Sequence, residues 1–221
     1  MKKMLIGILT ALILTAASAF GADTDSRTAA LNTLISKIEQ RYTLSGFTAK
    51  FDQYSTIKSM DITDTAGGML YIRRPGKMRW EYEKPEPQII ISDGIQLWIY
   101  RPSDNQVIIG KAPAFFGDGK GISFLSDLKI LRENFVASLE PDDDQGNSVI
   151  KLIPKKKNPD VEVIHMAVSR NTSDIIYAVT RNAYGDETRI ELSGFEFSDS
   201  LNPDLFTFTV PPGTDILELE Q

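Results

Sequence analysis

Apolar residues recur every three or four positions between residues 31 and 42, so they fall on one face of a helix. Polar residues at 23–25 can cap the first turn of such a helix. The spacing therefore predicts an amphipathic helix over residues 24–42. Its apolar face would consist of Leu31, Leu34, Ile35, Ile38 and Tyr42.

From Gly46 onward the pattern changes to a spacing of two, as in strands that bury one face. Glycine, proline and aspartate interrupt this alternation at intervals of roughly one strand, which is typical of hairpin turns. We therefore predict successive antiparallel strands over residues 46–110. Turns are expected at Gly67-Gly68, Pro75-Gly76, Pro85-Glu86-Pro87, Asp93-Gly94 and Pro102-Ser103-Asp104.

A glycine-rich stretch occupies residues 112–120, after which helical spacing returns at Ile122, Leu125, Leu128 and Leu131. We interpret residues 112–134 as a segment that interrupts the sheet with a second, shorter amphipathic helix. Strands resume over residues 147–210. Individual strands are expected near 147–154, 161–169, 174–182 and 187–197, with a last segment at 206–210.

The expected fold is mainly β with helices, an α+β architecture built on a single antiparallel sheet. A sheet of this many strands tends to curl, and the amphipathic helices can bury their apolar faces on its concave side. We therefore predict a curved sheet that forms an unclosed half-barrel, with its concave face covered by a helical lid. No internal repeat or linker divides the chain.

The first residues read as a secretory signal peptide. Two lysines precede an apolar run from about Met4 to Ala17, and Ala17-Ser18-Ala19 is a cleavage signal of small residues. The run is shorter than the roughly 20 residues that span a bilayer. We expect residues 1–19 to be removed on export, which leaves residues 20–221 as one domain.

Composition excludes several classes of function. The chain has no cysteine, which rules out disulfides, thiol chemistry and a lipid anchor on its own cysteine. It has one histidine, His165, and no GxSxG motif, so the usual hydrolase and metal sites cannot be assembled. With a net charge of −6 it is also unsuited to nucleic acid. We predict no enzyme, metal or cofactor.

One charge is out of place in this pattern. Leu70, Ile72 and Arg74 share one side of a predicted strand, so an apolar face would carry a guanidinium that is always charged. Such a charge must have a partner. The neighbouring Arg73 and Arg79 fall on the opposite side.

The chain has more large apolar residues than a catalytic site would need. They form either an ordinary core or the wall of a cavity for a hydrophobic ligand, since aromatic-lined concavities often hold ligands. The candidates are Met78, Trp80, Tyr82, Ile89 to Ile91, Trp98, Tyr100, Phe115, Phe116, Phe195 and Phe197.

Several short motifs, taken in order, resemble those of the periplasmic outer-membrane lipoprotein carrier family (LolA type). Each motif is weak alone, but the ordered set covers nearly all of the expected mature chain. The motifs are Phe47-Thr48-Ala49-Lys50-Phe51-Asp52-Gln53, Gly68-Met69-Leu70-Tyr71-Ile72-Arg73-Arg74-Pro75, Arg79-Trp80, Ile91-Ser92-Asp93-Gly94, Leu97-Trp98-Ile99-Tyr100, Phe206-Thr207-Phe208 and Pro211-Pro212-Gly213.

The resemblance implies an open barrel whose interior takes up the acyl chains of lipoproteins. Arg74 matches the family arginine that precedes a proline, and it would hydrogen-bond the lid and hold the empty cavity closed. Trp80 and Ile90 match cavity positions, and Met78 stands where the family more often has an aromatic residue. The implied cavity is therefore Leu70, Ile72, Met78, Trp80 and Ile90, and the implied lid residues are Leu31, Leu34, Ile35, Ile38, Leu125 and Leu128.

The resemblance also implies partners. Acylated lipoproteins would be the cargo, an inner-membrane ABC-type release complex the donor and an outer-membrane receptor the acceptor, with the carrier acting as a periplasmic monomer. The alternative is a lipid- or lipoprotein-sensing domain of the same fold in envelope-stress signalling. Such sensors usually carry an additional C-terminal domain, and we expect none here, because the chain ends soon after Gly213.

Overall fold

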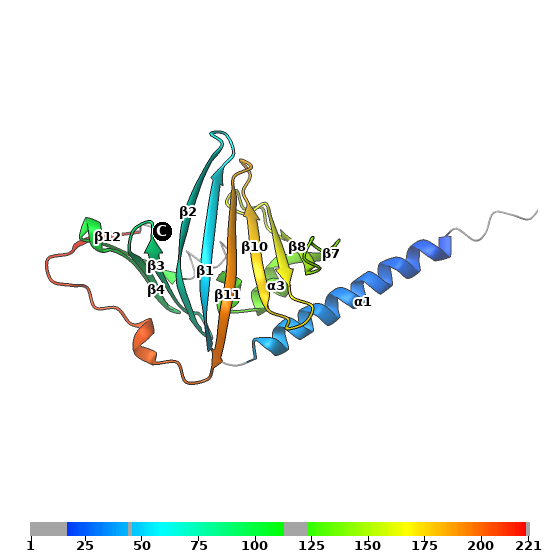
Figure 1. Cartoon of the computed structure of the whole chain (residues 1–221), viewed down its shortest axis with the longest axis horizontal. Helices are drawn as coiled ribbons and strands as arrows, with labels where there is room; N and C mark the ends of the chain where they lie inside the picture. The colour runs from blue at the N-terminus through cyan, green and yellow to red at the C-terminus, as the bar shows by residue number, and fades with distance from the viewer. Residues whose placement is uncertain (1–16, 44–45, 113–122, 220–221) are drawn as a thin grey trace, which may run out of the picture.

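All strands of the described part of the chain lie in one twisted, open sheet, as the computed structural model shows (Figure 1). The structure describes residues 17–43, 46–112 and 123–219, and the side chains of the helix from residue 25 onward. The predicted leader, residues 1–19, lies mostly outside this range. The elements are α1 (Ala17–Arg41), β1 (Gly46–Ile57), β2 (Ile62–Arg73), β3 (Lys77–Lys84), β4 (Gln88–Asp93), β5 (Gln96–Arg101), η1 (Pro102–Asp104), β6 (Gln106–Lys111), η2 (Ser123–Ser126), α3 (Lys129–Asn134), β7 (Phe135–Glu140), β8 (Ser148–Pro154), β9 (Val163–Val168), β10 (Ile175–Arg181), β11 (Glu187–Ser198), η3 (Pro203–Phe206) and β12 (Asp215–Glu218).

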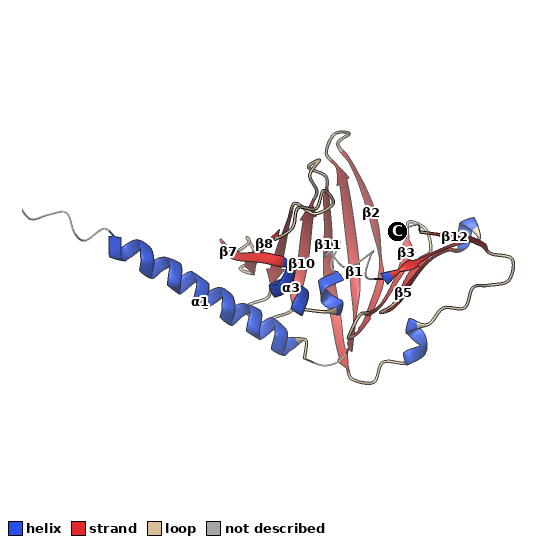
Figure 2. Cartoon of the chain, turned by 180° about the vertical axis from the view of Figure 1, so that it is seen from behind, coloured by secondary structure: helices blue, strands red, loops and turns tan. Residues whose placement is uncertain are grey.

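The order of the twelve strands is β12-β6-β5-β4-β3-β2-β1-β11-β10-β9-β8-β7. Neighbours are antiparallel except β12, which runs parallel to β6. Strands β6 and β7 follow each other in the sequence but lie near opposite ends of the sheet. The chain between them must therefore cross from one end to the other, and this crossing carries η2 and α3 (Figure 2). The predicted half-barrel with a helical lid is confirmed.

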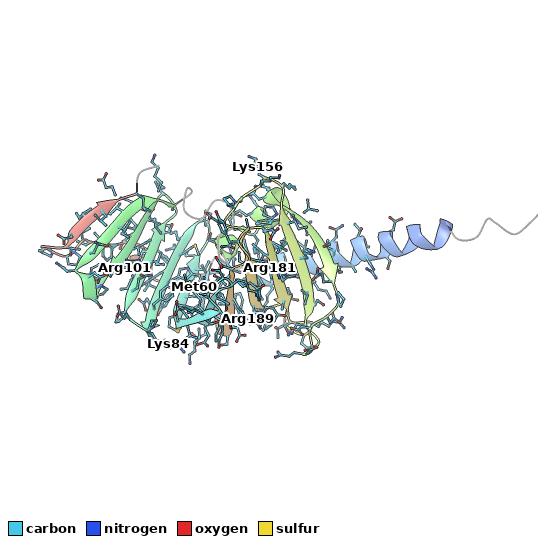
Figure 3. The ribbon with its side chains drawn as sticks, turned by 90° about the horizontal axis from the view of Figure 1, so that it is seen from above. Met60, Lys84, Arg101, Lys156, Arg181 and Arg189 are labelled. Atoms are coloured by element: carbon cyan, nitrogen blue, oxygen red, sulfur yellow. The ribbon has the colours of Figure 1, made fainter. Side chains whose placement is uncertain are left out.

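Helix α1 packs its C-terminal half against the sheet and extends past the β7 edge (Figure 1). The spacing of its apolar residues explains this, because Leu31, Ile35, Ile38 and Tyr42 are buried while the intervening residues are mostly exposed. Figure 3 looks down the long strands from the β1–β2 tip, where Met60 is labelled, and shows α1 leaving the sheet at this edge.

The second helix differs from the prediction. Helical spacing at 122–131 suggested one helix, but the described part of this region is a 3-10 turn, η2, followed by the short helix α3. The carbonyl groups of Leu125 and Ser126 accept hydrogen bonds from the β2–β3 turn instead of continuing a helix. Asp127 then accepts a hydrogen bond from the amide of Lys129, at 3.0 Å, where α3 begins. Ile122 and most of the glycine-rich stretch lie outside the described residues.

Three further differences concern strands. Gly67-Gly68, expected to form a turn, lies inside β2. Strand β7 follows α3 directly and was not predicted, although Phe135, Ala137 and Leu139 alternate with polar or exposed residues. Residues 199–214, expected to complete the strands up to residue 210, form no strand. They cross the convex side of the sheet, where η3 contacts β3 and β4, and we call them the strap. Prolines at 203, 211 and 212 lack the amide hydrogen that a sheet ladder needs.

Candidate functional site

The concave face of the sheet is a continuous apolar surface covered by the lid, which we define as α1 with Tyr42, η2 and α3. Of the predicted cavity residues, Leu70, Ile72, Met78 and Trp80 are at most 6% exposed and belong to one apolar cluster. Ile90 is partly buried and packs against this cluster and also against a smaller one formed by Leu97, Ile99 and Ala112. The face therefore continues along the sheet from the lid-covered part towards β5.

Aromatic rings line the middle of this face. Trp80 lies edge-on to Phe51, with ring centroids 4.7 Å apart, and stacks on Tyr82 at 6.3 Å. The Tyr82 hydroxyl donates to Oε1 of Gln53 at 3.1 Å. Burial raises the pKa of Tyr82 to about 12. The wall is thus apolar, and the Tyr82 hydroxyl is neutral and hydrogen-bonded.

The lid closes this face with side chains of the same chemistry. Of the predicted lid residues, Leu31, Ile35, Ile38, Leu125 and Leu128 are buried in the same cluster as the sheet residues. Leu34 is partly buried and packs against the cluster. Phe124 and Leu131 also belong to it, although the sequence analysis did not name them as site residues. Lid and wall therefore share one apolar interior.

Arg74 ties the β2–β3 turn to both parts of the lid. Its Nε donates to the carbonyl oxygen of Leu125 at 3.1 Å, and its Nη1 donates to the carbonyl oxygen of Tyr42. The guanidinium lies 5.5 Å from the Tyr42 ring centroid and 5.8 Å from that of Phe47. Burial lowers the pKa of Arg74, and electrostatic interactions with Tyr42 and Asp127 oppose that shift. The group remains a cation facing carbonyl groups and rings.

The sequence did not predict that Tyr42 would bind both Arg74 and β10. Its hydroxyl accepts a hydrogen bond from the amide of Ile175 in β10 at 3.0 Å, and burial raises its pKa. Its ring lies 5.4 Å from that of Phe47. One residue at the end of α1 therefore joins the helix to β10 through its side chain and to Arg74 through its carbonyl group.

The β2–β3 turn also meets the lid through its backbone. The amide of Gly76 donates to the carbonyl oxygen of Ser126 at 3.3 Å. Gly76 has a φ of +73°, and a Cβ there would lie 3.1 Å from the Cα of Gly94. Only glycine combines this backbone conformation with such a close approach. The turn that presents Arg74 is therefore fixed by backbone geometry.

Part of the large apolar inventory lies on the other side of the sheet. Phe206 of the strap is fully buried, and the ring of Phe208 lies 6.4 Å from Trp98 and 5.4 Å from Tyr100. Arg79 donates from Nη1 to the carbonyl oxygen of Leu205 at 3.2 Å. Trp98 and Tyr100 thus support the strap on the convex side and do not line the concave face.

The polar groups of the described residues offer little to a reaction. Nε2 of His165 lies 3.3 Å from Oε2 of Glu140, at the end of the sheet that holds β7 to β9. In the described ranges no group of three His, Cys, Asp or Glu residues is placed to hold a metal ion. None of the described helices is both long and apolar enough to cross a bilayer.

Solved structures confirm the fold alone. The TM-score is 0.56 to a conserved protein of Thermus thermophilus, with 11% identity over 86% of this chain and 99% of the other. It is 0.50 to a DUF1329 family protein of Desulfovibrio piger, with 12% identity over 82% of this chain and 97% of the other.

Two relatives found by sequence are both named outer-membrane lipoprotein carrier protein. The relative in Nitrosomonas europaea is 31% identical over 77% of this chain and 82% of its own length. That in Nitrosospira multiformis is 32% identical over 76% and 80%. The family model described as "Outer membrane lipoprotein carrier protein LolA" matches residues 42–209. The resemblance noted in the sequence is thereby confirmed, and the chain belongs to the LolA family of outer membrane lipoprotein carrier proteins.

Proposed function

We propose that this protein is a periplasmic carrier that holds the acyl chains of lipoproteins against its concave face and moves them from the inner to the outer membrane. An inner-membrane ABC-type release complex would supply the cargo and an outer-membrane receptor would accept it. Membership of the carrier family and the leader-like residues 1–19 support this assignment. No enzymatic step is part of the proposal.

The observation that carries the proposal is the interior shared by lid and sheet, into which Arg74 of the β2–β3 turn extends. Apolar contacts are not directional, so acyl chains can replace lid side chains on the wall without loss of complementarity. The hydrogen bonds from Arg74 to Leu125 and Tyr42 both end on the lid. A lid that moves away must give up these bonds, whereas the wall remains intact.

The free energies explain why a carrier needs such a bond. Burying one methylene contributes about 0.8 kcal/mol, so a single enclosed chain of sixteen carbons would gain roughly 12 kcal/mol. Bound so tightly, the cargo would leave slowly. Each hydrogen bond from a charged group contributes about 1.5–3 kcal/mol, so restoring the Arg74 bonds on closure offsets part of the gain. Release to a receptor with a better apolar surface then requires no nucleotide at that step.

The direct test is Arg74→Leu, with Arg73→Leu as the matched control. Arg73 is the neighbouring residue, ends β2 and faces the opposite side, so its loss changes the net charge equally. We expect both variants to fold and to load lipoprotein. The Arg74 variant should keep its cargo when mixed with acceptor membranes, while the Arg73 variant should transfer it at the wild-type rate.

The amount of lipoprotein transferred from purified loaded protein measures this outcome. Transfer by the Arg74 variant at the wild-type rate would refute the role of Arg74 as a latch. Failure of the wild-type protein to bind lipoprotein at all would refute the carrier function itself. The two results are distinguishable because loading is measured before transfer.

A further inference from the structure

A hollow of about 690 Å³ lies where α1 passes over the β7 edge of the sheet. One side of it is a single face of α1, contributed by residues 27 to 37, and the other side is the end of β7 with the β7–β8 and β9–β10 turns. Figures 1 and 2 show α1 alongside β7 at this edge. The hollow is separate from the Arg74 turn, which lies at the other end of the lid contact.

The floor of the hollow is continuous with the apolar interior. Leu34 of α1 and Leu139 of β7 line the hollow and also pack against the apolar cluster beneath the lid. Four residues with hydroxyl side chains also line the hollow, namely Thr33, Ser148, Ser169 and Ser173. A molecule seated here would therefore meet an apolar surface on its inner side and hydrogen-bonding groups on its outer side.

The α1 side of the rim carries two cations, Arg27 and Lys37, in a protein whose net charge is −6. The third cation of the lining, Arg170, lies on the other side of the hollow and is held in an ion pair. Both carboxylates of the lining are engaged within the fold. Asp142 pairs with Arg170, and Glu140 lies 3.3 Å from His165 and 3.5 Å from Lys151. The rim therefore favours a ligand that brings carboxylates or carbonyl oxygens.

We propose that this hollow seats the first residues of the cargo polypeptide, where they leave the acyl chains, and that it prefers acidic to basic peptide. The inference rests on the proposed carrier function. An acylated polypeptide changes from apolar acyl chains to polar peptide within a few atoms. The lining of the hollow changes in the same way, from the apolar Leu34 to the charged Lys37. Positive charges on the α1 rim attract peptide carboxylates and repel lysines.

The test uses two synthetic peptides that share one triacylated cysteine and differ only in the next four residues, acidic in one and lysine in the other. We expect wild-type protein to bind the acidic probe about fivefold more tightly than the lysine probe, as a few exposed ion pairs would produce. Lys37→Glu should remove this preference. Lys58→Glu is the control, because Lys58 is exposed at the β1–β2 tip and changes the net charge equally.

Photocrosslinking locates the peptide independently of its charge. A photoreactive residue placed at Ser173, in the hollow, should label the peptide part of the acidic probe. The same residue at Tyr184, which is 78% exposed in the β10–β11 turn, should not. Equal affinity for both probes, or equal labelling from both positions, would overturn the peptide site and leave the carrier function standing. Failure to bind either probe would overturn both.

Discussion

The sheet is covered on both faces, and the two covers are attached in different ways. On the convex side the strap is held by the fully buried Phe206 and by Arg79, whose Nε also pairs with Oε1 of Glu81 in the same strand at 2.6 Å. On the concave side the hydrogen bonds of Arg74 to Leu125 and Tyr42 end on the lid itself. Each cover is thus held by an arginine that donates to main-chain carbonyl groups, but only Arg79 is also paired with a carboxylate of its own strand.

The two attachments differ in what happens to their groups when the cover leaves the sheet. Both covers bury an aromatic ring, Phe206 in the strap and Phe124 in the lid, so ring burial alone does not distinguish them. A guanidinium that loses carbonyl partners regains them from water, so its cover can leave at lower cost. In the proposed carrier, acyl chains can replace the lid side chains on the wall, so we expect the concave face to be the one that opens.

The largest expected effect comes from Phe206→Ala. Removal of this buried ring should lower the free energy of unfolding by about 3–5 kcal/mol, measured by urea denaturation. The matched variant is Phe124→Ala, which removes an equally buried ring from the lid. If the covers differ as described, Phe124→Ala raises binding of a hydrophobic dye to the native protein and Phe206→Ala does not. Equal dye binding by both variants would show that the lid and the strap do not differ in this way.

Alkaline pH should weaken the wall beneath the lid. Burial raises the pKa of Tyr82 to about 12 from the ordinary value of 10.0, so the folded state holds this proton more tightly than the unfolded state. The contribution is complete below about pH 10 and is lost as pH rises towards 12, by roughly 2 kcal/mol. Tyr82→Phe should make the unfolding free energy fall less steeply in this range. An unchanged slope would assign the loss to other groups, such as Tyr42.

Arg79→Leu tests the arginine that contacts the strap, as Arg74→Leu tests the one that contacts the lid. It removes one hydrogen bond to the strap and the pair with Glu81, and we expect a loss of about 1 kcal/mol in the free energy of unfolding. Lipoprotein transfer should stay at the wild-type rate, because the strap does not cover the proposed cavity. A transfer defect like that expected for Arg74→Leu would show that both covers take part in release.

The smallest effect concerns the lid alone. Arg132 of α3 donates from Nε and Nη2 to the two carboxylate oxygens of Glu39 in α1, at 2.6 and 3.1 Å. The two side chains are 43% and 38% exposed, so Glu39→Gln should cost about 0.5 kcal/mol and less at high salt. Thermal unfolding at two ionic strengths measures it. A salt-independent cost would mean that the pair is not the link between the two lid helices.

The sequence carried enough information to predict the sheet and the position of Arg74. Alternation at Leu70, Ile72 and Arg74 places their side chains on one face wherever the strand goes, so the misplaced charge was recognisable before any tertiary contact. Its partners were not predictable to the same degree. They are main-chain carbonyl groups of Leu125 and Tyr42, and a carbonyl group is present at every residue.

The strap and β7 show why periodicity alone does not assign strands. Phe206 and Phe208 alternate with exposed threonines in the structure, as in a strand, yet the segment crosses the sheet and pairs with none of it. Alternation of buried and exposed residues indicates that a segment packs one side against the protein. It does not show that the segment is hydrogen-bonded to a neighbouring strand. Strand β7 had the same signal at Phe135, Ala137 and Leu139, but the helical spacing that ends just before it obscured its start.

Strand β12 affects how readily copies of the protein can associate through the edges of their sheets. An open sheet exposes unpaired backbone at its ends, and a second molecule could add to such an end and polymerise. Here β6 is paired by a parallel strand of only four residues, which begins at Asp215 and ends at Glu218. At the opposite end, α1 lies against β7. Strand β12 is shorter than β6 and has an acidic residue at each end, so it makes the addition of another copy at this end of the open sheet less favourable.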